Sequence, residues 1–154
     1  MWQQKKNIHF SSAATFDDKN LNKVNPQRQR NITAAKAEER LLSSLLANPD
    51  FYFKIKDEIK DEYFATDVNL QIYKLLASRL EEKKGIDVTY LSQDLPDEQI
   101  SYIVRLESMR VNLGNTVKEC LDCIERMKQE KKLREEKNPA QLTDDEWAAL
   151  FKKQ

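Results

Sequence analysis

The sequence predicts an all-α protein, in which a compact helical bundle is followed by a C-terminal helical hairpin on an extended charged helix. Through most of residues 33–127, apolar side chains recur at the three- and four-residue spacing of amphipathic helices. Only two glycines occur in 154 residues, whereas a sheet protein of this size needs many tight turns. The composition, 40% hydrophobic and 34% charged, is typical of a helical protein whose core occupies only part of the chain.

The first segment, residues 1–32, is rich in Asn, Gln, Lys and Ser, and its apolar residues show no sustained period. It is basic, because six cationic residues outnumber Asp17 and Asp18, which gives +4 and leaves −4 for the rest of a chain whose net charge is +0. The cations are Lys5, Lys6, Lys19, Lys23, Arg28 and Arg30. We therefore predict a flexible basic linker or tail over 1–32, a bundle over 33–127 and a hairpin over 128–154.

The bundle is expected to open with a helix that Thr33 caps and Asn48-Pro49 stops. Its inward face consists of small and aliphatic residues at helical spacing: Ala34, Ala37, Leu41, Leu42, Leu45 and Leu46. A shorter helical segment over 51–59 follows, with apolar residues at intervals of four: Phe51, Ile55 and Ile59. Tyr63 and Phe64 then form an aromatic step before the next helix.

That next helix is expected to begin at a capping Asp67 and to end at Lys83-Lys84-Gly85. There the lysine charges interact favourably with the last helix carbonyls, and a left-handed glycine allows the chain to turn. A short helix around 88–93 follows. Pro96 then opens a further helix. Its expected inward residues are Ile100, Ile103 and Val104.

The longest helix is predicted after Gly114-Asn115, with Thr116 and Glu119 in capping-box relation. Its buried stripe is expected to comprise Val117, Cys120, Leu121, Ile124 and Met127. Residues 128–137 are charged at eight of ten positions, with opposite charges four residues apart. Such pairs stabilise a helix that has little to pack on, so this part should project beyond the bundle.

A last helix, from about Thr143 to Lys153, is expected to complete the hairpin. Thr143 is its cap, and Leu142 and Trp147 occupy hydrophobic-staple positions. Trp147, Leu150 and Phe151 form a compact apolar stripe. A helix this short is marginal alone, and the charged segment facing it offers little apolar surface. We therefore expect this stripe to dock on a partner protein, the alternative being that it folds back onto the bundle.

Catalytic, metal and membrane features are missing from the sequence. The single histidine is His9, and no glycine-rich loop precedes a lysine. The only cysteines are Cys120 and Cys123, too few for a structural zinc. The acidic group over 57–62 is interleaved with lysines and favours a solvated face over a magnesium site. No membrane span or signal segment is visible, and no global basic charge indicates duplex DNA. We expect a cytoplasmic protein without catalytic or metal residues.

The stretch AEERLLSSLLANPDFYFKIKDEIKDEYFATDVNLQIYKLL resembles the opening of the N-terminal domain of bacterial replicative helicases. Ala37-Glu38, the leucine pairs at 41/42 and 45/46, Pro49, Tyr63-Phe64 and the helix around Ile72-Tyr73 carry this resemblance, and GIDVTYLSQDL follows. The C-terminal domains of bacterial primases share that fold, a bundle followed by a helical hairpin. The resemblance spans about 34–127 for the bundle and, more loosely, 128–154 for the hairpin.

Of the two families, the primase C-terminal domain is preferred. In the helicase a linker helix leads into an ATPase domain with a phosphate loop, whereas here the charged helix and a short capped helix end the chain. In the primase the bundle comes last, after a linker that 1–32 would suit.

The resemblance implies a domain, monomeric alone, that docks on the N-terminal collar of the hexameric replicative helicase and modulates helicase and primase activity. Its hairpin makes the main contact, here through the anchors Leu142, Trp147, Leu150 and Phe151 and the flanking Lys152 and Lys153. The parent primase would hold its zinc and magnesium elsewhere, so no cofactor is expected here. Two alternatives stay open: a self-associating N-terminal domain of a replicative helicase, and a DNA-binding helical regulator that uses the basic residues of 1–32.

Overall fold

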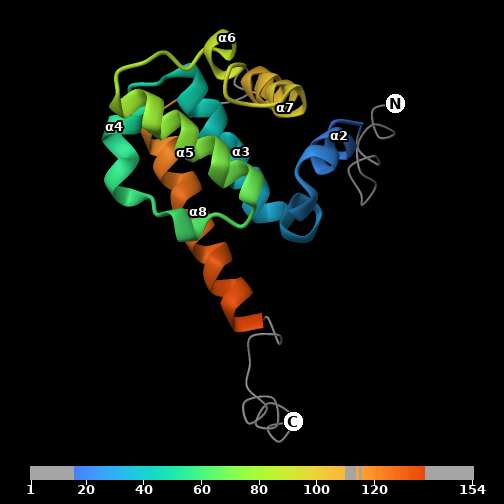
Figure 1. Ribbon diagram of the computed structural model, residues 1–154. Helices are drawn as coiled ribbons and strands as arrows, with labels where there is room; N and C mark the ends of the chain where they lie inside the picture. Colours follow the sequence, from blue (N-terminus) through green and yellow to red (C-terminus); the bar gives the residue numbers. More distant parts are fainter. Residues whose placement is uncertain (1–15, 110–113, 115, 138–154) are drawn as a thin grey trace, which may run out of the picture.

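The computed structural model describes residues 16–109, 114 and 116–137, and all the regular structure within these residues is helical. Figure 1 shows a bundle from which the end of the last described helix, α8, extends to one side. The all-α prediction is confirmed over the described residues, while the predicted terminal helix of the hairpin lies outside them. None of the described helices is long and apolar enough to cross a membrane.

The centre of the bundle is α3 (Ile32–Ala47), which contacts α4, α5, α7, α8 and the short helix η1. Alanine, leucine and glutamate favour this helix, and its interior contains neither glycine nor proline. The two leucine pairs at 41/42 and 45/46 are all buried, as predicted. Thr33 lies inside the helix rather than capping it, because the preceding 3-10 helix η1 leads directly into α3.

The predicted segment 51–59 is shorter as an α-helix than its spacing indicates. It comprises α4 (Phe51–Ile55) and the 3-10 helix η2 (Lys56–Glu58), after which Ile59 is extended. Ile55 and Ile59 are both buried, so the apolar spacing predicted the burial of these two residues correctly. Tertiary packing decides the backbone here, because the chain must turn through η3 (Asp61–Tyr63) to reach the next helix.

Helix α5 (Asp67–Glu81) begins one residue earlier than the predicted cap Asp67 implies, because the N-cap is Thr66. Its C-terminus is a Schellman motif: the N–H groups of Lys84 and Lys83 donate to the carbonyls of Arg79 and Leu80 at 2.8 and 3.0 Å. The left-handed residue is Lys83, with φ 59°, and Gly85 has no positive φ. The prediction of a left-handed Gly85 was therefore wrong, because the helix ends at Glu81 and its left-handed turn falls at Lys83, two residues before the glycine.

Two further helices complete one side of the bundle, α6 (Val88–Leu91) and α7 (Asp97–Ser108), the latter starting after Pro96 as predicted. In α7 the buried residues are Tyr102, Ile103 and Leu106, whereas Val104 is 48% exposed. The prediction that Val104 points inward was wrong, because at 100° per residue it lies on the opposite side of the helix from Tyr102 and Leu106.

Residues 16–31 differ from the prediction of a flexible tail. They form α2 (Phe16–Val24) and η1 (Pro26–Asn31), which contact α7 and α3 respectively. Leu21, Asn25 and Arg28 are buried. The tail prediction was therefore wrong for 16–31, because polar groups rather than a periodic apolar stripe hold this segment. Residues 1–15 lie outside the described part of the chain.

Candidate protein-interaction surface

Helix α8 (Val117–Lys137) is anchored through its first half. The Glu119 N–H donates to Thr116 Oγ1 at 3.1 Å, which confirms this bond of the predicted capping box. Cys120, Ile124 and Met127 are buried in the interface with α3 and α4. Leu121 is 38% exposed, so the prediction that it belongs to the buried stripe was wrong.

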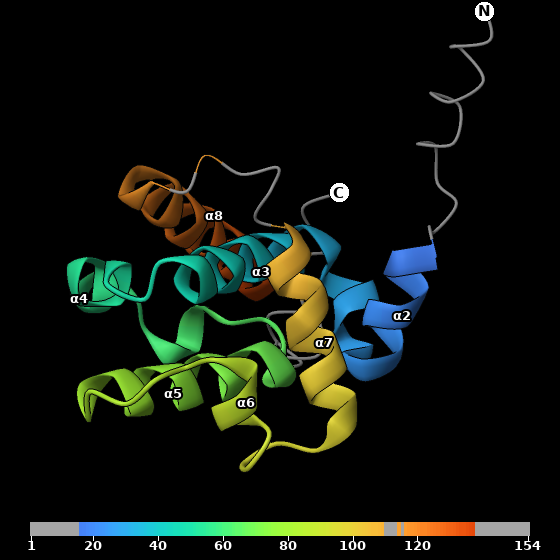
Figure 2. The ribbon, with the colours of Figure 1, turned by 90° about the horizontal axis from the view of Figure 1, so that it is seen from above.

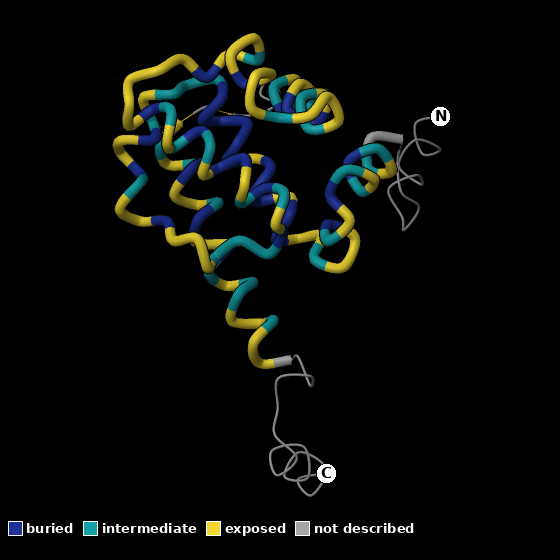
Figure 3. Tube along the Cα trace, viewed as in Figure 1, coloured by how far each residue is buried: buried dark blue, intermediate teal, exposed yellow. Residues whose placement is uncertain are grey.

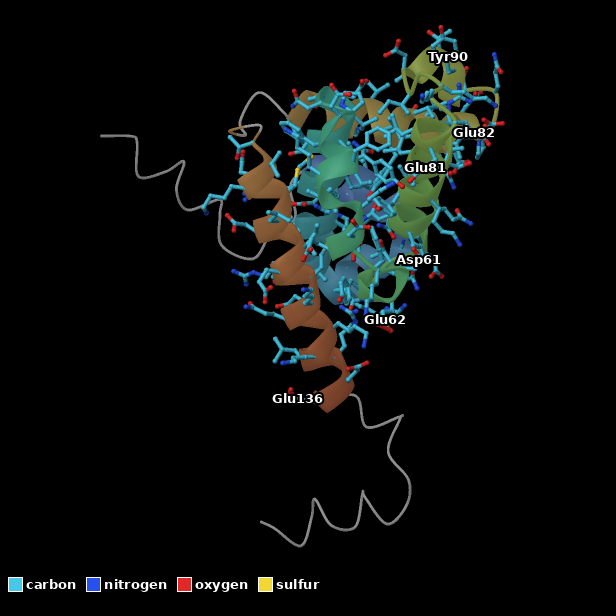
Figure 4. The ribbon with its side chains drawn as sticks, turned by 90° about the vertical axis from the view of Figure 1, so that its left-hand side faces the viewer. Asp61, Glu62, Glu81, Glu82, Tyr90 and Glu136 are labelled. Atoms are coloured by element: carbon cyan, nitrogen blue, oxygen red, sulfur yellow. The ribbon has the colours of Figure 1, made fainter. Side chains whose placement is uncertain are left out.

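The second half of α8, residues 128–137, is named the arm here. None of its side chains from 128 to 136 is buried, and Leu133 is 41% exposed. Figure 3 shows the change from buried to exposed residues along α8, and Figure 4 shows Glu136 near the far end, beyond the bundle. The predicted projecting helix is thus present, and it continues to Lys137.

The base of the arm is held by charged and aromatic contacts. Lys128 Nζ lies 5.6 Å from the ring centroid of Tyr63 in η3. Within the arm, Lys131 Nζ and Glu135 Oε2 form one of the predicted i,i+4 pairs at 2.5 Å. Arg134 lies close enough to the buried Glu38 for its charge to lower the pKa of that carboxyl. Lys128 and Arg134 thus join the arm to η3 and α3.

Glu38 is a fully buried carboxylate at the junction of α3, α5 and the arm. It accepts hydrogen bonds from Ala65 N at 2.6 Å, Thr66 Oγ1 at 2.8 Å and Asn69 Nδ2 at 2.9 Å. A side chain of α3 therefore binds the start of α5, whose own N-cap makes no side-chain capping bond. Burial raises the pKa of Glu38, and the three hydrogen bonds offset this only in part.

A chain of buried polar side chains joins this junction to the N-terminal helices. The Tyr102 hydroxyl donates to Asn69 Oδ1 at 2.6 Å and accepts from Asn25 Nδ2 at 3.4 Å. In parallel, Gln27 Oε1 accepts the backbone N–H of Asp67. The start of α5 thus rests on groups from η1 as well as α3, which makes residues 25–31 part of the bundle.

Arg28 forms the second buried polar cluster. Its Nη2 donates to Glu39 Oε1 at 3.2 Å, its Nε donates to Glu39 Oε2, and its Nη1 reaches Asp18 at 2.9 Å and Asn22 at 3.0 Å. Burial alone would lower the pKa of Arg28, but the bonds to Glu39 and Asp18 raise it above its usual value. Sequence reasoning missed Glu38 and Glu39. Two acidic residues on an otherwise apolar helix face were the available signal.

The partner-binding residues predicted from the sequence all lie outside the described residues: Leu142, Trp147, Leu150, Phe151, Lys152 and Lys153. What the structure provides is the helix that leads to them. Within the described part of the chain, no group of three or more potential metal ligands comes together. Burial raises the pKa of Cys123 to about 11 and also raises that of Cys120, so both thiols are protonated at neutral pH.

Comparison with known proteins identifies the family. The model of the DnaB-like helicase N terminal domain matches residues 30–126, well over half of the chain. The chain belongs to the DnaB-like helicase N-terminal domain family. This family is a helical, non-catalytic domain with a helicase-related role in DNA replication, where it takes part in interactions among replication proteins. Neither the curated proteins nor the solved structures gave a match.

The family match begins at Arg30 and ends at Arg126. It contains Glu38 and the three residues that donate hydrogen bonds to it, but leaves out α2, most of η1 and the arm. The residues that carry the sequence resemblance have structural roles within it. The leucine pairs are core, and Phe64 packs on Tyr73 with ring centroids 5.4 Å apart.

Proposed function

We propose that this chain is the helicase-binding domain of a bacterial primase, which docks on the N-terminal collar of the replicative hexameric helicase in the cytoplasm. The observation that carries the proposal is the arm. It extends from the bundle as a continuous helix, none of its side chains from 128 to 136 is buried, and Leu133 is exposed on it. A charged helix of this kind presents whatever follows it to a partner, and the predicted anchors Trp147, Leu150 and Phe151 follow it in sequence.

The expected energetics make the anchors testable. Fully burying one large apolar side chain contributes roughly 1.5–3 kcal/mol, and aromatic residues are the commonest dominant contacts of protein interfaces. Replacing both Trp147 and Phe151 by alanine should therefore weaken association with the cognate helicase by at least about a hundredfold. Phe53→Ala is the matched control, because Phe53 is an aromatic of α4 that is 47% exposed and far from the arm in sequence.

Titration calorimetry of the full chain and these variants against the cognate hexameric helicase tests the proposal. Removal of residues 139–154 should abolish measurable binding while the bundle stays folded, which circular dichroism checks. Unchanged affinity of that truncated chain would reject the hairpin as the anchor. Equal losses for the Phe53 control and the double variant would show that the contact is not on the hairpin.

The alternative is an N-terminal domain of a replicative helicase that associates with copies of itself, and the family match favours it because the family carries that name. Sedimentation velocity over a range of concentrations separates the two functions. A monomer that binds the helicase agrees with the primase domain. Concentration-dependent rings, weakened by the Trp147 and Phe151 substitutions, would instead establish the helicase domain.

The third function considered, DNA binding through the basic residues of 1–32, is less well supported. Arg28, one of the six cations of that segment, is buried in its cluster with Glu39 and Asp18. It is therefore not exposed to phosphate groups. Salt-dependent DNA binding that disappears without residues 1–32 would restore this function.

A further inference from the structure

Helix α3 carries two exposed cations that separate two hollows of the bundle surface. Figure 2 shows α3 between α8 on one side and α7 and α2 on the other. A hollow of about 510 Å³ lies on the α8 side, and one of about 310 Å³ lies on the α2 and α7 side. Lys36 and Arg40 line both hollows.

The charges around the larger hollow are only partly balanced. Lys36, Arg40 and, across the hollow on α8, Arg126 are exposed, and none of them forms an ion pair with another residue of the described ranges. Two carboxylates also line it, but Asp122 is bonded to Lys118 at 3.0 Å. Three cations therefore face Glu119 and one carboxylate that already has a partner.

A few small or apolar side chains lie among the charged residues that line the hollows. Ala37 and Cys123 line the larger hollow, and Leu21 and Met109 line the smaller one. This combination fits a peptide that brings spaced carboxylates to the cations and lays an apolar side chain between them. We propose that the Lys36–Arg40 ridge, with Arg126, binds an acidic peptide segment of another replication protein.

Single-stranded nucleic acid is the competing ligand with negative charge, and the lining disfavours it. Among the described residues, no aromatic side chain lines either hollow, whereas single-strand sites combine cations with aromatic stacking platforms. A continuous phosphate backbone would also meet Glu119 and Asp122, which a peptide with spaced carboxylates can avoid. Lys36, Arg40 and Arg126 all lie outside the arm, so this proposal does not depend on the proposed helicase contact.

Fluorescence anisotropy of a labelled peptide in which glutamate and leucine alternate, titrated with the full chain, tests the proposal. We expect saturable binding that a glutamine-for-glutamate peptide does not show. Lys36→Gln with Arg40→Gln should raise the Kd at least about tenfold, and Arg126→Gln, on a different helix, should raise it as well. Lys54→Gln with Lys60→Gln is the control with equal charge change, because both lysines are exposed and lie outside the hollows.

Two kinds of result would overturn the proposal. Absence of peptide binding, or equal loss in the Lys54 and Lys60 control, overturns the proposal. Binding of a thymidine oligonucleotide of equal charge that depends on Lys36 and Arg40, with no peptide binding, also overturns it and assigns the ridge to nucleic acid. Thermal unfolding of each variant confirms that a lost signal reflects the ridge rather than the fold, and Arg126→Gln provides the test if the α3 variant is unfolded.

Discussion

Replacing Arg28 by methionine tests whether residues 16–31 belong to the folded domain. The Arg28 and Glu39 side chains are only 2% and 1% exposed, and Arg28 also reaches Asp18 and Asn22. Methionine keeps much of the apolar stem but leaves the Glu39 carboxylate buried without its cation. Breaking a buried ion pair from one side costs about 3–5 kcal/mol. We therefore expect Arg28→Met to lower the free energy of unfolding by about 3 kcal/mol.

The pair can be separated from its members by a double-mutant cycle. Glu39→Leu alone should be less costly than Arg28→Met, because Arg28 keeps Asp18 and Asn22 as partners. The double variant should cost at least about 2 kcal/mol less than the sum of the two single variants, since it leaves no buried unpaired charge. Arg30→Met is the control, because Arg30 is an exposed cation of the same short helix.

Urea unfolding followed by circular dichroism measures these differences. Hydrogen exchange at the amides of Asn25 and Arg28, which donate to Leu21 and Asn25 carbonyls at 2.9 and 3.0 Å, shows whether the N-terminal helices detach before the bundle opens. A loss below about 1 kcal/mol for Arg28→Met, or one equal to that of Arg30→Met, would refute the reasoning. In that case α2 and η1 would contribute little to the domain.

Three further predictions concern the bundle. Burial raises the pKa of Glu38 above its ordinary 4.5. The free energy of unfolding of the native chain, relative to that of Glu38→Gln, should therefore be greatest below pH 4.5 and should fall as pH rises through the pKa of the folded state. A difference in unfolding free energy that grows with pH would contradict this. Lys83→Gly should raise the thermal midpoint and stabilise by about 0.5–1 kcal/mol, since it removes a left-handed residue with a side chain, and an unchanged midpoint would count against it. Leu42→Ala should cost about 2–5 kcal/mol in urea unfolding, whereas Leu133→Ala on the arm should cost under about 0.5 kcal/mol; similar losses would mean that the arm is packed.

The sequence by itself determined the helical class and most of the core. The leucine pairs of α3, the starts of α7 and α8 and the loss of the apolar stripe after Met127 all follow from spacing and capping chemistry. These features are local, because residues only three or four positions apart determine a helix face and a helix terminus. The predicted anchors Leu142 and Trp147 rest on the same local signals and stay predictions, since they lie outside the described residues.

Only the tertiary structure decided which polar residues are buried and what they hold. Glu38 binds the start of α5 from another helix, Tyr102 joins Asn69 to Asn25, and Arg28 fastens α2 and η1 through Glu39. The partners of these bonds lie eleven to seventy-seven positions apart in the chain. The periodicity of the sequence does not predict such pairs. From the sequence alone, a single acidic or cationic residue is predicted to be exposed to solvent. It can be buried only where the fold places a partner beside it, because burying an unpaired charge is costly.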